Sequence, residues 1–340
     1  AKSKQTIVLI QAPTPSDRLN MNGFDFIGDI HGHHDALVSL LRKLGYAPTG
    51  TTWRHPENRQ VVFLGDYLDR GPQILETLTT VRHMVEGGDA VAIIGNHEFN
   101  YLAWMTPWSE EGREWCRAHT PSNHKQVAET LAALEGQETD WMEWLCTLPP
   151  AWEADGVRAV HACWNHEAIA TLQEAYNGAG GRWSTDFIRE ASRKGSELYN
   201  AVEGAMKGPE IALPEHAAYE DAQGKRRTQA RIAWWHPPRL GEPIGPQLVP
   251  ANDVVTDLLS DARPWPTDAA NSPGSPLTFF GHYWLLSDPP RPLSKHAICL
   301  DYSVAKNGFL FAYQYKGESE ANEHHLIWTE PTAPNAPHPQ

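Results

Sequence analysis

Residues 24–45, FDFIGDIHGHHDALVSLLRKLG, contain a short apolar run, a polar turn and a helical pattern in succession. The run FDFI is rich in Phe and Ile, which is typical of a buried strand. Four leucines follow at three- and four-residue steps, at positions 37, 40, 41 and 44, and this spacing predicts a helix with one apolar face. Gly45 stands where a left-handed C-cap would end that helix. The segment therefore predicts a strand, a turn and a helix that leads the chain back.

Two further apolar runs repeat this order along the chain. QVVFLGD at 60–66 and AVAIIGN at 90–96 are rich in Val and Ile, and each ends in Gly followed by a polar residue. Between them, apolar residues recur at helical steps from Ile74 to Val85. Strands that alternate with helices predict parallel strands joined by crossover helices. The fold class expected from the sequence is therefore α/β.

The composition is that of a folded globular protein, with 41% hydrophobic and 21% charged residues. The formal net charge of −14 argues against stable nucleic-acid binding, because gripping that backbone requires clustered Lys and Arg. The four cysteines show no CxxC spacing, so we expect buried, reduced thiols. We also expect a cytoplasmic protein without membrane contact, since we find neither a signal-peptide pattern nor a run of about 18 apolar residues.

The remainder of the chain divides by composition. Residues 101–150 are helical in pattern and rich in Trp, and we interpret them as a helical cap segment. Residues 165–276 are rich in Trp and Pro, and we interpret them as an insertion or lid, with one helical piece at 184–206 and a loop-like remainder. We expect one domain over residues 1–340 to contain both, with a flexible tail at 328–340. Further strands are predicted at 156–162, 277–283, 297–303 and 308–315.

Polar motifs follow the predicted strands at the point where each strand ends. They are GDIHG at 28–32, GDYLDRG at 65–71 and GNHE at 95–98, and single histidines, His161 and His282, end two later strands. Ligands gather at the carboxyl ends of strands in such sheets, so these side chains should converge. Carboxylate and imidazole groups bind divalent cations, and a carboxylate can bridge two of them. A single DxH pattern is weak, but the whole series predicts a metal site.

This series of motifs resembles the calcineurin-like metallophosphoesterase superfamily, and within it the phosphoprotein phosphatase branch. The DRGP end of the second motif and its spacing are also similar to bacterial diadenosine tetraphosphate hydrolases. The match is nearly complete over residues 24–100 and thinner afterwards. The resemblance implies a central β-sandwich of mixed sheets flanked by helices, here with the Trp- and Pro-rich insertion.

The resemblance also implies a role for each motif residue. Asp29, His31 and His282 would belong to the two-metal shell, with Asp66 bridging the ions. Asn96 and His161 would ligate the second metal. Arg70 would hold the phosphate oxygens, and His97, oriented by Asp69, would protonate the leaving oxygen. The metals would be divalent, manganese first, with Fe, Zn or Co also compatible with O and N ligands.

These roles predict a hydrolase that acts on phosphoric esters by direct attack of a metal-bridging hydroxide, without a phosphoenzyme. The first expectation for the substrate is a phosphomonoester, either phosphoprotein Ser/Thr or a small molecule. The alternative is hydrolysis of a dinucleoside polyphosphate or a phosphodiester. A scaffold without catalysis is not favoured, because every ligand position and the acid are present.

Several residues near the motifs have less certain assignments. His33 and His34 are expected to face solvent or cap a helix, and His236 is a weaker rival of His282 as the late ligand. Arg231 is the preferred second phosphate clamp in a segment that also contains Arg226 and Arg227, and Lys207 is a weaker candidate. A nucleotide substrate would make stacking platforms of the tryptophans close to the motifs, which are Trp164, Trp235 and Trp284.

Overall fold

We describe a computed structural model of the chain. The residues that it describes are 22–109, 114–220, 226–252, 255, 258–261, 265, 275–285, 291–306 and 308–331. All candidate site residues named above lie within these ranges. Of the predicted tail, residues 332–340 lie outside them, so that prediction stays untested there.

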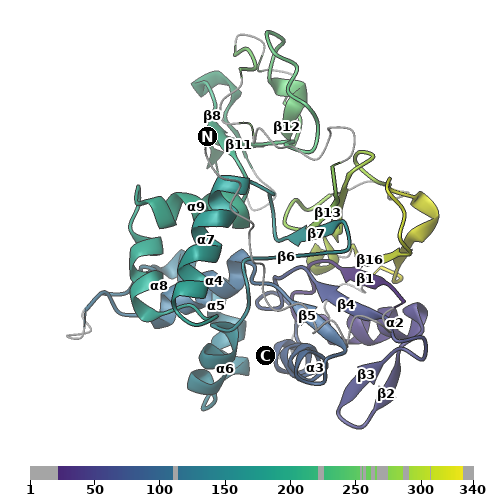
Figure 1. Ribbon diagram of the computed structural model, residues 1–340. Coiled ribbons are helices and arrows are strands. Elements are labelled where there is room, and N and C mark those ends of the chain that lie inside the picture. Colours follow the sequence, from purple (N-terminus) through teal and green to yellow (C-terminus); the bar gives the residue numbers. More distant parts are fainter. Residues whose placement is uncertain are drawn as a thin grey trace, which may run out of the picture.

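A six-stranded sheet forms the first half of the core (Figure 1). The strands β1, β4 and β5 run parallel, and β16 pairs antiparallel with β1. The parallel arrangement predicted for the first hundred residues is therefore confirmed. The strands of this sheet are β1 (Phe24–Ile27), β4 (Gln60–Phe63), β5 (Ala90–Ala92), β15 (Asp301–Tyr302), β16 (Phe309–Tyr315) and β17 (Leu326–Trp328).

A four-stranded sheet forms the second half, in the order β14-β13-β7-β6. Strand β13 runs parallel to both β7 and β14, whereas β6 pairs antiparallel with β7. The predicted strands after residue 150 are all present. The strands of this sheet are β6 (Ala151–Ala154), β7 (Val157–Val160), β13 (Leu277–Phe280) and β14 (Ala297–Cys299).

Aromatic side chains join the two sheets. Phe26 of β1 stacks on Phe279 of β13 with ring centroids 3.7 Å apart, and Phe24 meets the edge of Trp152 at 4.8 Å. These residues belong to one buried cluster that includes inward-facing residues of both sheets. The architecture is thus a mixed α/β sandwich of two sheets flanked by helices, and the predicted fold class is confirmed.

Helices α2 (His34–Leu44) and α3 (Ile74–Glu86) connect the parallel strands of the first sheet. The four leucines of α2 are all buried, as their spacing predicts. Gly45 ends α2 in the left-handed conformation, with φ of 97°, which a glycine adopts without strain. A small hairpin, β2 (Ala47–Thr49) and β3 (Thr52–Arg54), follows α2.

The predicted helical cap consists of α4 (Asn96–Met105), α5 (Pro121–Ala133) and α6 (Glu138–Leu145). Helix α4 begins inside the GNHE motif, earlier than the predicted boundary at residue 101. Glu98 at the third position of α4 accepts the N–H of Gly95, which stabilises the first turn. This early start places three residues of the motif, Asn96, His97 and Glu98, on a helix.

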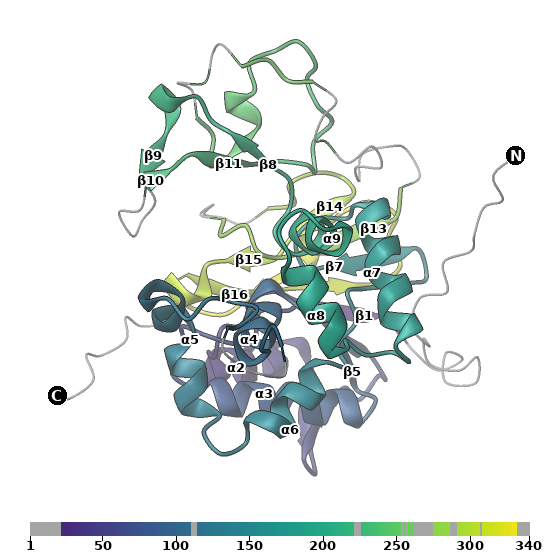
Figure 2. The same ribbon diagram turned by 90° about the vertical axis from the view of Figure 1, so that its left-hand side faces the viewer.

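Residues 165–206 form three helices that pack into the main core. They are α7 (His166–Gly178), α8 (Thr185–Ser192) and α9 (Glu197–Met206), shown side by side in Figure 2. The single helical piece predicted at 184–206 is wrong, because Gly195 has φ of 88° and interrupts it. Ser196 then accepts the N–H of Tyr199 and starts α9 afresh.

The rest of the predicted insertion contains strands, so the expectation of a loop-like segment is wrong. A three-stranded sheet in the order β12-β11-β8 lies in a small lobe that projects from the sandwich in Figure 1. Its own buried cluster, which includes Ile232, Leu248 and Trp265, explains how such short strands persist. The strands are β8 (Glu210–Ala212), β9 (Tyr219–Glu220), β10 (Arg226–Arg227), β11 (Gln229–Ile232) and β12 (Leu248–Val249).

Short 3-10 helices complete the described elements. They are η1 (Glu215–Ala217), η2 (Gly245–Gln247), η3 (Val304–Lys306) and η4 (Glu323–His325). Among the described residues, no helix has the length and apolar character that crossing a membrane requires. The cysteines are free, and three of them, Cys146, Cys163 and Cys299, are buried as predicted.

Candidate metal centre

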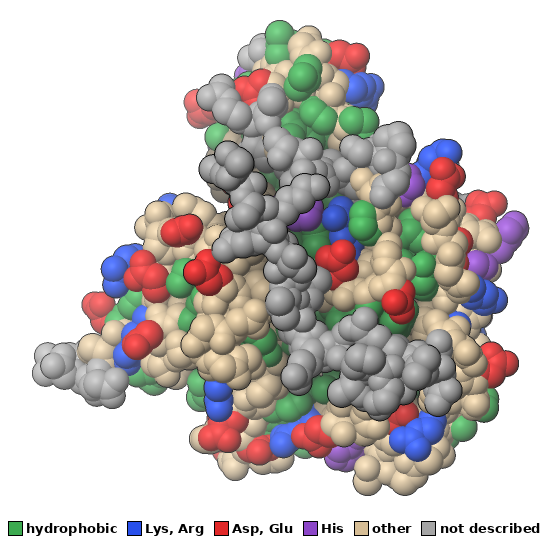
Figure 3. All heavy atoms as spheres, viewed as in Figure 1, with side chains coloured by type: hydrophobic (Ala, Val, Ile, Leu, Met, Phe, Trp, Pro, Cys, Tyr) green, Lys and Arg blue, Asp and Glu red, His purple; other side chains and the backbone are tan. Residues whose placement is uncertain are grey.

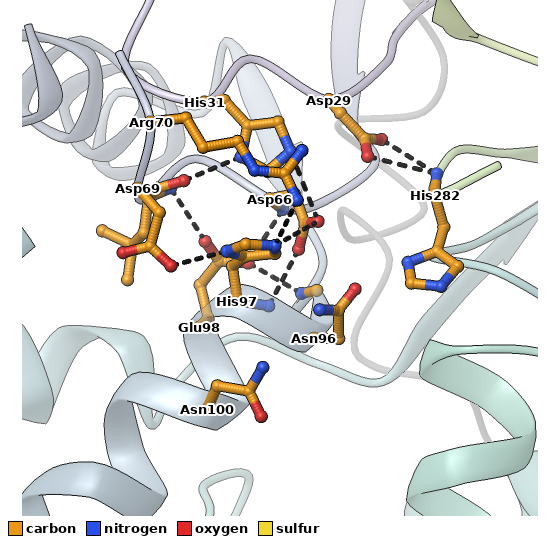
Figure 4. Close-up of polar contacts among 12 residues, drawn as sticks. Asp29, His31, Asp66, Asp69, Arg70, Asn96, His97, Glu98, Asn100 and His282 are labelled. Carbon is orange, nitrogen blue, oxygen red and sulfur yellow. Dashed lines mark hydrogen bonds and ion pairs between the residues drawn. The ribbon is translucent and has the colours of Figure 1, made fainter. Parts of the chain in front are cut away.

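The predicted ligands come together where the two sheets meet (Figure 4). Asp29 follows β1, Asp66 follows β4 and Asn96 begins α4 after β5, while His161 and His282 follow β7 and β13 of the other sheet. Each residue lies at the carboxyl end of a parallel strand, as the strand-end argument requires. The chain segments that carry Asp29 and His282 are far apart in sequence, so the sandwich itself assembles the site.

The backbone turns sharply at these motif positions. His31, Asp66 and His282 have φ of 47°, 54° and 73°, a region that side-chain-bearing residues seldom adopt. Asp69 and Arg70 share this conformation, with φ of 65° and 71°. Non-glycine residues in such conformations gather at functional sites, where the surrounding structure holds them. Five of them in one centre therefore mark it as a candidate functional site.

Two glycines of the motifs permit close approach to the carboxylates. A Cβ on Gly281 would lie 1.9 Å from Oδ1 of Asp29, and one on Gly95 would lie 2.3 Å from Oδ1 of Asp66. Neither carboxylate could keep its place beside a larger residue. The absence of a side chain at Gly281 and Gly95 therefore leaves room for the carboxylates of Asp29 and Asp66.

Two groups of potential ligand atoms share Asp66. One consists of His31, Asp66 and His97, and the other of Asp66, His161 and His282, with the ligand atoms of each group within 4.8 Å of one another. Nε2 of His31 lies 3.7 Å from Oδ2 of Asp66, and Nε2 of His161 lies 3.3 Å from Oδ1. The two oxygens of Asp66 therefore face different histidines, which is what a bridging carboxylate requires.

The amide of Asn96 belongs to the second group. Its Oδ1 lies 3.1 Å from Nε2 of His161, so both atoms point to the same space. Asp29 approaches from the other side, and its carboxylate accepts the backbone N–H of His282 at 3.1 Å. Oxygen and imidazole donors thus surround one centre, as Figure 4 shows.

The histidines are oriented as metal ligands. Nδ1 of His31 lies 2.8 Å from the carbonyl of Leu68, and Nδ1 of His161 lies 2.8 Å from that of Leu64. A carbonyl only accepts, so each Nδ1 donates, and each ring is held with its Nε2 facing Asp66. In the described part of the chain, Nε2 of His31 and Nε2 of His282 are buried without a hydrogen-bond partner. Buried polar atoms are normally paired, so these two fit a missing cation.

The charges of the centre lead to the same conclusion. Burial raises the pKa of Asp29 well above its ordinary value, and Asp301 and Asp66 add repulsion. Burial also acts to raise the pKa of Asp66, but His161 and His97 outweigh it and hold that pKa well below its ordinary value. Burial lowers the pKa of His161, yet Asp66 reverses the effect and raises it to about 10. Clustered buried carboxylates thus demand positive charge, which divalent cations would supply.

A second assembly of side chains adjoins the ligand groups. Nδ1 of His97 lies 2.6 Å from Oδ2 of Asp69, and Nε2 of His97 accepts from Nη2 of Arg70 at 3.0 Å. All three residues were predicted from the GDYLDRG and GNHE motifs, and the structure brings them together. A histidine backed by a buried carboxylate is a suitable general acid.

Thr130 of α5 holds Asp69 in place, which the sequence did not indicate. Its hydroxyl donates to Oδ1 of Asp69 at 2.5 Å and accepts the backbone N–H of Asp69 at 3.1 Å. Thr130 is fully buried and lies 61 residues from Asp69 in the sequence. No local motif marks such a residue, because only the packing of α5 against the site brings it there.

Replacing Thr130 by Val should lower kcat about tenfold and leave KM nearly unchanged, because Asp69 loses the partner that orients His97. The unpaired N–H of Asp69 should also cost about 1–3 kcal/mol of unfolding free energy. Steady-state kinetics with phenyl phosphate, whose leaving group needs protonation, and thermal melts would measure both effects. Thr130→Ser keeps the hydroxyl and should restore kcat, and a Ser variant as slow as the Val variant would contradict this positioning role.

Two buried acids at the site were also absent from the predicted set. Glu98 accepts the backbone N–H groups of Asp66 and Tyr67 at 2.8 Å each, and burial raises its pKa to about 7. Asp301 is 2% exposed and accepts the N–H of Trp284 at 2.8 Å. The apolar run AICL ends directly before Asp301, so the strand-end pattern used for Asp29 could have found it.

The residues with less certain assignments have different outcomes. His33 occupies the N-cap position of α2, as one of its two expected roles requires, but it is buried and makes no side-chain capping hydrogen bond. His236 is exposed in the small lobe, whereas His282 is in the centre. Trp164 and Trp235 are buried and offer no open face to a base, and Trp284 is partly exposed.

The basic residues of the insertion differ in exposure and in partners. Arg226 and Arg227 are exposed in β10, and Nζ of Lys207 pairs with Glu203. Arg231 in β11 is half-buried, with its guanidinium carbon 5.9 Å from the ring centroid of Tyr283. Arg231 also lowers the pKa of His282, after burial, so its charge reaches the centre. Its role as a second phosphate clamp stays a prediction.

A family model described as calcineurin-like phosphoesterase matches residues 24–166. These residues carry the first three motifs and His161, and over them the chain is similar to the calcineurin-like phosphoesterase family. The resemblance inferred from the motifs is thus confirmed over this part of the chain.

The chain is also similar to bis(5'-nucleosyl)-tetraphosphatases of bacteria. The asymmetrical bis(5'-nucleosyl)-tetraphosphatase PrpE of Halalkalibacterium halodurans is 46% identical over 74 residues, which are 22% of this chain and 30% of that protein. The symmetrical bis(5'-nucleosyl)-tetraphosphatase of Paracidovorax citrulli is 27% identical over 264 residues, covering 66% of this chain and 85% of that protein. The chain thus spans less than a third of the PrpE length but most of the symmetrical enzyme.

Solved structures show distant likeness. A putative diadenosine tetraphosphatase has a TM-score of 0.42 at 19% identity, covering 91% of this chain and 97% of that one. A protein serine/threonine phosphatase from Saccharomyces cerevisiae has a TM-score of 0.46 at 12% identity, covering 93% and 81%.

Proposed function

We propose that the protein is a phosphoesterase that uses two divalent metal ions. The observation that carries this proposal is the pair of buried ligand groups that share the two oxygens of Asp66. Asp29, His31 and Asp66 would hold one ion, and Asp66, Asn96, His161 and His282 the other. When bound, the two cations would neutralise the phosphate and supply hydroxide near neutral pH. Manganese suits this set of oxygen and nitrogen donors.

The remaining residues would handle the phosphate and the leaving group. Arg70 offers a planar fork of N–H donors that matches two phosphate oxygens. As its guanidinium turns to the phosphate, Nε2 of His97 is released from the contact with Nη2 of Arg70. His97 can then carry a proton on Nε2 and donate it to the departing oxygen, while Asp69 stabilises the resulting charge and orientation.

Two substrate classes remain candidates under this proposal. The sequence favoured a phosphomonoester of a protein or a small molecule, whereas the names of the relatives favour a dinucleoside polyphosphate. Both need the same metal centre, and they differ in what binds beyond the phosphate under attack. Because the symmetrical relative aligns over most of its length, we propose a dinucleoside polyphosphate as the first candidate substrate. The small lobe, as the predicted lid, would contribute to this choice.

Metal removal tests the proposal directly. After chelation the protein should show no turnover of p-nitrophenyl phosphate, its bis ester or diadenosine tetraphosphate, and added Mn should restore it. Bound metal at about 100 times its Kd should add about 2.7 kcal/mol of stability, a rise in Tm on the order of 5 °C. Elemental analysis would count the ions. Turnover that persists without metal, or none with any of Mn, Fe, Zn and Co, would overturn the proposal.

A further inference from the structure

A second cation lies beside Arg70, on the indole of Trp284. The guanidinium carbon of Arg70 and the Nζ of Lys306 each lie 3.9 Å from the Trp284 ring centroid. The two charges are therefore at most twice that distance apart. Trp284 is partly exposed and Lys306 is exposed, so both can meet a ligand from solvent. Figure 3 shows basic, acidic, histidine and hydrophobic side chains near the middle of one face of the molecule, below the small lobe.

The buried carboxylate of Asp301 fixes the backbone on both sides of this contact. Its Oδ2 accepts the N–H of Trp284 at 2.8 Å, and its Oδ1 accepts the N–H of Ser303 at 3.0 Å. The carbonyl of Ser303 in turn accepts the N–H of Lys306 at 2.7 Å. One buried side chain thus sets the positions from which Trp284 and Lys306 extend.

The guanidinium of Arg70 and the ammonium of Lys306 suit different kinds of phosphate contact. Arg70 is partly buried and reaches His97, whereas Lys306 lies over the same indole and is exposed to solvent. A lysine ammonium is a mobile point charge with three donors, which suits the oxygens of a phosphate that need not be held rigidly. A separation of at most twice 3.9 Å is compatible with contacts from the two cations to consecutive phosphates of an anhydride chain.

We propose that Trp284 and Lys306 form a subsite for a second phosphate group, the one bonded to the phosphate that Arg70 holds. The subsite would favour phosphoanhydrides over simple phosphomonoesters, because a monoester has no group to place on Lys306. Trp284 is the positioning residue that holds both cations, and Lys306 contacts the ligand. This inference rests on the proposed function, since it takes the metal centre as the site of the first phosphate.

Equilibrium binding of two non-hydrolysable probes tests the subsite. We would titrate the Mn-loaded full chain with methylenediphosphonate and with methylphosphonate by calorimetry, in the wild type and in K306M. Met keeps the packing of the stem on the indole without the charge. Losing one charge-assisted contact should weaken diphosphonate binding roughly tenfold and methylphosphonate binding less than about twofold. K306R should restore the diphosphonate affinity.

Lys295 offers a matched control for the change of charge. It is exposed and pairs with Glu320, so K295M should change neither affinity. Equal weakening of both probes in K306M, or no weakening of either, would overturn the subsite. A protein that discriminates between the probes through Lys306 but turns over no phosphoester would instead contradict the proposed function, so the two failures are distinguishable.

Discussion

Replacing Asp66 by Asn should reduce phosphoesterase activity by at least about a thousandfold, equivalent to about 4 kcal/mol of transition-state stabilisation. The reason is that the two oxygens of Asp66 face His31 and His161, so this carboxylate is the group that both ligand sets share. Asn keeps one oxygen, which can still accept the N–H of His97, so the local backbone should persist. Elemental analysis should find the metal content of D66N below that of the wild type.

Asp89→Asn makes the same chemical change at the opposite end of β5. Asp89 pairs with Arg54 and accepts from Thr52, away from the metal centre. Metal content and kcat of D89N should match the wild type. If D66N kept both metals and most of its activity, Asp66 would not bridge, and the proposed two-metal function would have to be abandoned.

Replacing His97 by Ala should lower kcat about 100- to 10,000-fold when the leaving group is a poor one, because the departing oxygen loses its proton donor. The loss should be much smaller for p-nitrophenyl phosphate, whose leaving group needs little protonation. Phenyl phosphate and p-nitrophenyl phosphate, compared in wild type and H97A, would measure the difference. The metal content should stay that of the wild type.

The metal content of H97A distinguishes between two possible roles of His97, metal ligand and general acid. Its ring lies close to His31 and Asp66, so the geometry alone also admits it as a ligand. The hydrogen bonds of His97 with Asp69 and Arg70 favour the role of general acid. Loss of a metal in H97A would assign His97 to the ligand shell. His83→Ala, at a histidine of α3 that contacts the carbonyl of Thr51, is the matched control and should change neither kcat nor metal content.

Local sequence patterns were enough to predict which side chains gather at the candidate metal centre. Asp29, Asp66 and His161 each follow a short apolar run, and a parallel strand delivers whatever follows it to one edge of the sheet. The strands and the helices α2 and α3 were predicted correctly for this reason, and the predicted ligand residues lie close together in the structure. The same pattern extends to Asp301, which directly follows the apolar run AICL.

Other features depended on contacts between distant segments. The hydroxyl of Thr130 reaches Asp69 only because α5 packs across the site, and α5 has no motif of its own. The sequence of the small lobe predicts a loop because its strands span only two to four residues, which is too short for a periodic pattern. In the structure, a separate cluster of buried residues stabilises these strands. His33 looks like a solvent-facing residue of a polar turn, yet the surrounding chain buries it.

The sequence by itself determined the α/β class, the positions of the core strands along the chain and the side chains that follow each strand. Each of these features depends on a pattern within a few residues. The tertiary structure alone decided which atoms meet. It turned the two oxygens of Asp66 toward different histidines, placed Thr130 on Asp69, and put Arg70 and Lys306 on the same indole. These contacts join segments far apart in the chain, and packing of the two sheets and their helices brings those segments together.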